Sequence, residues 1–529
     1  MTQTPTTDSL NSDRHMAVTI GRNTVFGIAS SVVVIGTRFV MVPVVIYHLG
    51  LGGYGIWSII MATAGYLRFG SAGIKSAFQK YVAEATGNGD FATANKLLST
   101  GSISMLGLSL AALIPIAMFS RALATASGVP PNFLHAAAAS ITLLALIMVG
   151  ANFGAAYEAI LTGGHRIDLT RSFAIATTVS EAIAIITLLH FGYGLFAMAI
   201  VMATSELVYV VLCYFASRVV IPEIRIGLHN FTSSVFRELI RFALSYQVVN
   251  VLEVLYGMLL PVIILKYFGA DLAGVYAVVS RLVTAAAMGQ DATILPLLSG
   301  GTLIFALGSR ERTARFFKKA FKTTLAITLA PLSFVAAFGT VIILAWTGQS
   351  GSVFKVSLWL VCAAAFFQCV SRLQLILYRA SGNALHDNLR QAFRLGALLI
   401  LAFLGRRIGF YGVLAGVLLA EFVGVLYMFL ALKSAMPEFQ PSSLFSDASK
   451  VTVATGGVIA AGTLATVIHY PWGTTTRSAA LFELCAVVIA CLAASWPALA
   501  VTKVTTGEER KAVLALLMPW KRRAVISAQ

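Results

Sequence analysis

Charged residues are scarce in this sequence. Asp, Glu, Lys and Arg make up 11% of the 529 residues, and hydrophobic residues make up 58%, whereas about 25% of the residues of a typical soluble domain are charged. A chain of this length and composition cannot hide its apolar side chains in a water-soluble core. The composition therefore excludes a soluble protein and predicts a polytopic membrane protein.

Cysteine is rare as well. The five cysteines all fall in apolar runs and show no paired metal-ligand spacing: Cys213, Cys362, Cys369, Cys485 and Cys491. We interpret them as small core residues rather than as a disulfide framework or a zinc site. The eight histidines are scattered, so the sequence predicts no metal, no cofactor and no catalytic constellation.

Acidic residues are few, with 21 Asp and Glu against 38 Lys and Arg, which gives a net charge of +17. An excess of this size is also found in proteins that bind nucleic acid. Here, however, the basic residues lie in short connections between apolar runs, which is typical of the positive-inside distribution of membrane proteins. We therefore expect the lipid bilayer, and no nucleic acid, as a partner.

The apolar runs are long enough to cross a bilayer, because about 20 residues rising about 1.5 Å each span the hydrocarbon core. Fourteen such spans are expected, at 24–49, 54–80, 97–119, 134–161, 170–190, 195–217, 241–266, 274–307, 323–346, 355–380, 391–405, 410–432, 451–470 and 479–501. With the N-terminus inside, 28 of the 38 basic residues fall in inside segments, 6 in outside segments and four within spans. This asymmetry predicts that both termini are cytoplasmic.

Two parts of the chain resemble each other. The segment 43–50 (PVVIYHLG) recurs as 261–269 (PVIILKYFG), and 54–58 (YGIWS) is echoed at 276–280 (YAVVS). Chance similarity between apolar segments is the alternative explanation. Because the copies lie six spans apart, they have the same orientation, as in parallel-repeat transporters. The expected parts are a cytoplasmic tail (1–22), an N-lobe of six helices (23–217), a cytoplasmic linker (218–240), a C-lobe of six helices (241–433), two C-terminal helices (451–501) and a basic cytoplasmic tail (502–529).

The first hairpin carries a family resemblance. After a proline-containing first helix come Leu49-Gly50, Tyr54-Gly-Ile-Trp57, Gly65-Tyr-Leu67 and Gly70-Ser-Ala-Gly-Ile74. This pattern resembles the start of the Wzx-type polysaccharide-biosynthesis flippases, which belong to the multidrug/oligosaccharidyl-lipid/polysaccharide (MOP) exporter superfamily. The resemblance implies an all-α transporter of the bacterial inner membrane, not an enzyme, in which two further helices follow the twelve of the repeat. Drug/cation exporters of the same superfamily usually have twelve spans.

Four arginines lie within the predicted spans: Arg38, Arg68, Arg281 and Arg372. Each would cost roughly 2.5–3.5 kcal/mol at the centre of a bilayer, so we expect them to face protein or water. The resemblance implies that spans 1, 2, 7 and 8 line a central cavity, where arginines meet the diphosphate of a lipid-linked substrate. Arg38, Arg68 and Arg281 lie on three of these spans. Arg372 lies outside them and is included for its polar helix face.

Two acids, Glu253 and Asp291, lie on polar stripes of adjacent spans. We interpret them as candidates for ion coupling or as counter-ions of the arginines; a packing pair between Arg281 and Glu253 is the structural alternative. Four other acids are interpreted as single buried hydrogen-bonding residues rather than proton-coupling sites: Glu181, Glu206, Glu421 and Glu483.

Together these features favour a flippase for a polyprenyl-diphosphate-linked oligosaccharide in O-antigen, capsule or exopolysaccharide synthesis. A cationic cavity between the two lobes would open to each side in turn, and polysaccharide polymerase or export proteins would be further partners. The alternatives are a drug/cation antiporter of the same superfamily, a membrane glycosyltransferase and a scaffold of polysaccharide assembly. A glycosyltransferase would need a larger outside loop than the longest one here, at about 120–133.

Overall fold

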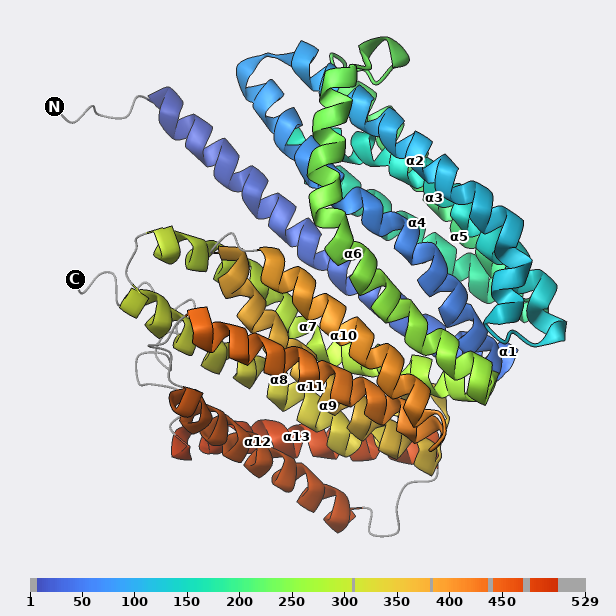
Figure 1. Ribbon diagram of the computed structural model, residues 1–529, viewed down its shortest axis with the longest axis vertical. Helices are drawn as coiled ribbons and strands as arrows, with labels where there is room; N and C mark the ends of the chain where they lie inside the picture. The colour runs from blue at the N-terminus through green and yellow to red at the C-terminus, as the bar shows by residue number, and fades with distance from the viewer. Residues whose placement is uncertain (1–6, 307–309, 381–383, 436–440, 470–475, 503–529) are drawn as a thin grey trace. The chain divides into compact units, whose positions relative to one another are not determined.

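The fold is entirely helical in the part of the chain that the computed structural model describes, residues 7–306, 310–380, 384–435, 441–469 and 476–502. Helix accounts for 92% of the structure, which confirms the all-α prediction. Figure 1 shows the helices, in order α1 (Thr7–Asn88), α2 (Phe91–Ala126), α3 (Pro131–Gly163), α4 (Ile167–His190), α5 (Leu195–Val220), the 3₁₀ turn η1 (Leu228–Asn230), α6 (Ser233–Phe268), α7 (Ala270–Ala306), α8 (Arg310–Thr347), α9 (Ser352–Ala380), α10 (Ala384–Gly405), α11 (Phe410–Ala435), α12 (Pro441–His469) and α13 (Arg477–Val501).

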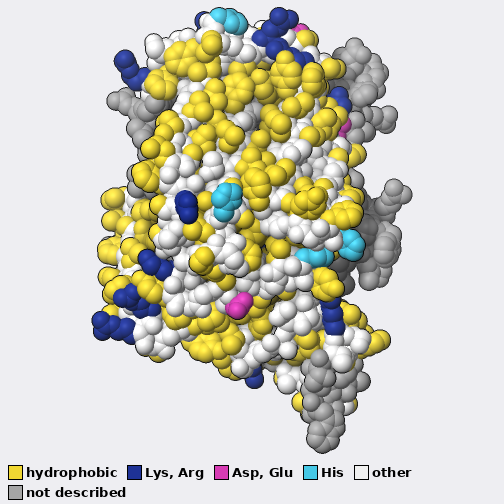
Figure 2. Space-filling view, turned by 90° about the vertical axis from the view of Figure 1, so that its right-hand side faces the viewer, with side chains coloured by type: hydrophobic (Ala, Val, Ile, Leu, Met, Phe, Trp, Pro, Cys, Tyr) yellow, Lys and Arg dark blue, Asp and Glu magenta, His cyan; other side chains and the backbone are white. Residues whose placement is uncertain are grey.

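Eleven stretches of the described helices are long and apolar enough to cross a membrane. One of them, Ala29–Thr63, runs through a break in α1, and neither α6 nor α10 contributes a stretch to the eleven. The count of fourteen spans and the cytoplasmic termini therefore stay predictions. Figure 2 shows a face on which hydrophobic side chains spread widely and charged ones are few. Such a surface suits contact with lipid rather than with water.

The chain divides into two compact units, Met1–Ala277 and Val278–Gln529. In the first unit α3 packs against α1, α2 and α5, while α4 packs against α1 and α5. Helix α6 contacts α1 and α2, so this unit extends through α6 into the start of α7. The lobe boundaries expected from the sequence, with a linker at 218–240, stay a prediction.

Helix α1 consists of two rods that meet at Gly50. The backbone there is non-helical, with φ 73° and ψ 170°, and Figure 1 shows the two rods joining at one end of the unit. Gly269, between α6 and α7, has nearly the same conformation, with φ 87° and ψ 175°. Few residues other than glycine adopt this region. The two sequence copies thus end in the same local backbone geometry, as the internal repeat predicts.

The connection between α5 and α6, residues 221–232, is bound tightly to the first unit, and we name it the strap. Asn95 of α2 donates from Nδ2 to the carbonyl of Glu223 at 3.0 Å and accepts at Oδ1 from the backbone N–H of Arg225 at 2.6 Å. Ser99 and Thr100 accept two further strap N–H groups, of Gly227 and Thr232, at 3.1 and 3.0 Å. The strap is therefore part of the first unit and not a loose linker.

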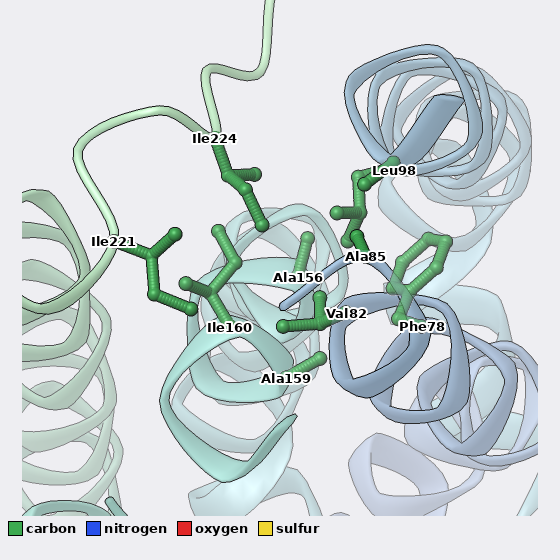
Figure 3. Packing of buried hydrophobic residues seen from close by; sticks show 10 residues of the cluster. Phe78, Val82, Ala85, Leu98, Ala156, Ala159, Ile160, Ile221 and Ile224 are labelled. Atoms are coloured by element: carbon green, nitrogen blue, oxygen red, sulfur yellow. The ribbon is translucent and has the colours of Figure 1, made fainter. Parts of the chain in front are cut away.

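Two strap isoleucines complete a hydrophobic cluster at this end of the unit. Ile221 and Ile224 are buried, and Figure 3 shows them beside Ile160 of α3, with Phe78 and Val82 of α1 close by. Apolar burial of this kind stabilises the strap in addition to its hydrogen bonds.

In the second unit α9 and α10 each pack against α11, and α12 and α13 pair with each other and with α8. Phe338 of α8 meets Val487 and Cys491 of α13 in a small core. Arg477, at the start of α13, donates to the carbonyls of Ala345 and Trp346 at 3.0 and 2.6 Å. Because these are among the last carbonyls of α8, the guanidinium caps that helix where its dipole favours a cation.

Candidate functional site

Arg38 lies in the first rod of α1, and its side chain is exposed. The charges of Arg38 and of Glu206 on α5 both act on the carboxylate of Glu181 on α4. Helix α4 packs against both α1 and α5, so the charges of three residues far apart in sequence interact. We name Arg38, Glu181 and Glu206 the α1–α4–α5 cluster; the interpretation of the two acids as structural hydrogen-bonding residues stays a prediction.

An apolar groove lies beside this cluster. It has a volume of about 230 Å³ and is lined by Thr37, Val40 and Met41 of α1 and by Val179, Ala182, Ile183 and Ile186 of α4. Typical pockets for drug-sized ligands measure about 300–1,000 Å³. Its lining has one polar side chain, so the groove offers almost no hydrogen bonds to a sugar. It is an apolar groove beside the charged α1–α4–α5 cluster.

A further polar contact links α3 to α5. The side chain of Tyr209 hydrogen-bonds with those of Glu158 and Cys213. The sequence does not single out Glu158, because a lone acid near the end of an apolar run gives no signal by itself. Glu158 is therefore a further polar residue within the apolar helices of the first unit.

Three other predicted site residues lie on α6, α7 and α9. Arg281 on α7 and Glu253 on α6 are exposed, and Arg372 on α9 is half-buried. The side chains of Arg68 in α1 and Asp291 in α7 lie outside the described residues. The structure neither joins nor separates Arg281 and Glu253, which belong to different compact units. The assignment of these residues to a substrate cavity therefore remains a prediction.

The second unit contains a buried charged cluster on α9, α10 and α11. Arg394 is 2% exposed and donates from Nη2 to Glu421 Oε1 at 2.5 Å, while its Nη1 donates to Gln391 at 3.0 Å. Arg390, also buried, donates to the hydroxyl of Ser371 at 3.1 Å. We name this group the α9–α11 cluster.

The α9–α11 cluster corrects two sequence interpretations. The count of inside basic residues includes Arg390 and Arg394 as part of a connection, but α10 begins at Ala384 and buries both side chains. Glu421 is buried and hydrogen-bonded as expected, but it is not a single acid, because its carboxylate is ion-paired with Arg394. The available signal is the spacing of Arg390, Gln391 and Arg394, which places them on neighbouring positions of one helical face.

No group of three or more metal-ligating side chains occurs among the described residues. The two charged clusters contain arginine and carboxylates, and each lies within a bundle of apolar helices. Such intramembrane charges are expensive and commonly mark a transport pathway or a fixed ion pair. Chemically, they can hold ions or protons and can bind charged groups.

Several solved structures of membrane transporters have a similar arrangement of helices. The solved structure of the lipid II flippase MurJ in an inward closed conformation is similar, with a TM-score of 0.67 and 15% sequence identity over 89% of this chain and 97% of that one. An inward-facing multidrug resistance MATE family transporter of the MOP superfamily has a TM-score of 0.60 and 16% identity over 79% and 96%. A variant of the Vibrio cholerae MATE transporter VcmN has a TM-score of 0.56 and 15% identity over 81% and 99%.

The chain has the fold of the MOP superfamily transporters. No family model matches the sequence, and no curated protein matches it either. At 15–16% identity these similarities establish the fold and no more. The fold implied by the resemblance of the first hairpin is thus confirmed, whereas membership of the superfamily and the Wzx-type assignment within it belong to the proposal that follows.

Proposed function

We propose that this protein is a flippase that moves a polyprenyl-diphosphate-linked oligosaccharide across the bacterial inner membrane. It works by alternating access of its two lobes around a cationic cavity and serves the synthesis of a surface polysaccharide. The observation that carries the proposal is the exposed guanidinium of Arg281 in an apolar stretch of α7.

An arginine that faced lipid at this position would cost roughly 2.5–3.5 kcal/mol. Arg38 is exposed in a second apolar stretch, and the two costs together would reach about half of a typical net stability of about 5–15 kcal/mol. These side chains are better accommodated by water and by an anionic ligand. The planar fork of arginine can bind a diphosphate through paired hydrogen bonds. Because flipping makes and breaks no covalent bond, it requires no catalytic residue.

The similarity to a structure named as a lipid II flippase supports a lipid-linked substrate. Polysaccharide polymerase or export proteins would receive the flipped product, and Arg68 and Arg372 would contribute to the same cationic surface. Glu253 and Asp291 would serve ion coupling or balance the arginines.

A drug/cation antiporter is the second candidate, and the α1–α4–α5 cluster favours it. The cluster holds two carboxylates, Glu181 and Glu206, and one arginine, so its charge balance suits a cation or a proton better than an anion. The similar MATE transporters are described as multidrug resistance proteins, which supports the same alternative.

The test of the flippase uses Arg281. Arg281→Lys keeps a positive charge and should retain part of the flipping activity, while Arg281→Gln should lose most of it at normal membrane abundance. Surface polysaccharide and membrane abundance are measured together. Arg407→Gln, at an exposed arginine between α10 and α11, is the matched control and should leave both unchanged.

Full polysaccharide in cells carrying Arg281→Gln would contradict the proposal. Efflux of a cationic dye distinguishes the second candidate. If vesicles containing the wild-type protein extrude the dye and Glu181→Gln abolishes extrusion, the protein is an antiporter.

A further inference from the structure

The strap (residues 221–232) has two faces of opposite character. Its inner face buries Ile221 and Ile224 against α1 and α3, as Figure 3 shows. Its outer face exposes Leu228 at 79% and Phe231 at 40% of their surfaces. Val219, just before the strap, is 83% exposed. Three large apolar side chains thus stand outward within a short stretch of chain.

The position of the strap explains how such exposure is tolerated. The strap crosses the first turns of α2 at Asn95 and Ser99 and contacts the last turn of α3 at Ile160. Both helices are apolar enough to cross the membrane, and these are their ends. Apolar side chains at the end of a membrane span lie at the level of the lipid headgroups, where they can enter the acyl region instead of water.

The charge around the outer face is predominantly positive. Arg225 and Arg237 are exposed, and Arg218 lies over the ring of Tyr214 at 5.4 Å from its centroid. Among the strap residues themselves, Glu223 is the acid that opposes these charges. Exposed arginines flanking apolar anchors are complementary to anionic headgroups, which attract juxtamembrane basic residues.

We propose that the outer face of the strap is a binding site for anionic phospholipid. Arg225 and Arg218 bind the headgroup phosphate, while Leu228 and Phe231 insert between the acyl chains. The hydrogen bonds between the strap backbone and the side chains of Asn95, Ser99 and Thr100 hold the strap in place before the lipid arrives. The site is therefore preorganised and loses little conformational entropy on binding. This inference does not depend on which substrate the protein transports.

The experiment uses the full chain in nanodiscs of phosphatidylcholine with a minor fraction of phosphatidylglycerol. The protein is then released into mild detergent, and native mass spectrometry measures the phosphatidylglycerol that it retains. Arg225→Gln should reduce this retention about fivefold, the factor expected for losing one basic residue at an anionic surface. Arg225→Gln combined with Leu228→Ser should reduce it further. Arg121→Gln, at an exposed residue near the other end of α2, should leave it unchanged.

Equal retention by the wild type and the Arg225→Gln/Leu228→Ser variant would overturn the proposal, as would an equal loss in Arg121→Gln. A third outcome would assign the surface to a protein partner instead. In that case the Arg225→Gln/Leu228→Ser variant retains as much lipid as the wild type, but a soluble protein copurifies with the wild type and not with the variant. Thermal unfolding of each variant in detergent is the control for folding. Each variant should unfold at the temperature of the wild type, because the substituted side chains are exposed and the backbone hydrogen bonds between the strap and α2 remain.

Discussion

Arginine has two different roles in this chain, set by its surroundings. Arg394 is enclosed by α10 and α11 and paired with Glu421, whereas Arg38 is exposed and interacts with Glu181. A buried arginine must keep its partner, because an isolated charge in a medium of low polarity is very costly. An exposed one can exchange a carboxylate for a ligand.

Arg38 tests whether the α1–α4–α5 cluster is structural. Arg38→Gln should lower membrane abundance, because Glu181 and Glu206 are left without their cation. Arg38→Gln combined with Glu181→Gln should restore abundance, because one repelling carboxylate is removed. If Arg38 also binds substrate, surface polysaccharide stays low in the double variant. Recovery of both quantities would show that Arg38 has no part in substrate binding.

Glu421 tests the buried pair. Glu421→Gln leaves the Arg394 charge buried with a neutral partner, which should cost about 3–5 kcal/mol. Replacing the pair by Arg394→Met and Glu421→Leu should cost less than Glu421→Gln alone, because no charge then remains at that position. The measurement is thermal unfolding in detergent. Additive losses in the double variant would contradict a direct coupling between the two side chains.

At the scale of elements, glycine determines where long helices break. The rods of α1 meet at Gly50, and α6 gives way to α7 at Gly269, both with positive φ and extended ψ. A proline precedes each of them by two turns of helix, at Pro43 and Pro261. In each sequence copy, the corresponding helix therefore ends at a glycine with positive φ that follows a proline by two turns.

Substitution of these glycines should strain the backbone. Gly50→Ala and Gly269→Ala should each destabilise the protein by about 1–3 kcal/mol, the cost of a sparsely populated backbone region. Gly107→Ala is the control: this glycine is exposed within α2, and a methyl group added to its Cα would enter open space. That change should be neutral or stabilise by up to about 1 kcal/mol. Equal thermal stability of Gly50→Ala and the wild type would contradict the strain.

At the scale of the whole molecule, apolar helices and basic connections decide the topology. Helix α8 ends at Thr347 and α9 begins at Ser352, so Ser350 lies in a short connection; Gly89 lies in the connection between α1 and α2. The positive-inside asymmetry places the first outside and the second inside.

A reporter that is active only outside the membrane checks this orientation. Fused after Ser350 it should be active, and fused after Gly89 it should be silent. The reverse result would invert the topology, and equal activity at both sites would contradict the span count between them.

The sequence by itself determined the class of this protein. An 11% share of charged residues allows a chain of 529 residues no fold but a membrane bundle, and the repeated segments 43–50 and 261–269 end at the two glycines where the structure breaks the helices. Helical periodicity assigns a residue to a face of its own helix but does not say which helix covers that face. Only the tertiary structure shows that the charges of Glu181 and Arg38 interact, that Arg394 pairs with Glu421, and that Asn95 of α2 binds the strap. These contacts join positions from 27 to more than 100 residues apart, and they are decided by how the helices pack around one another.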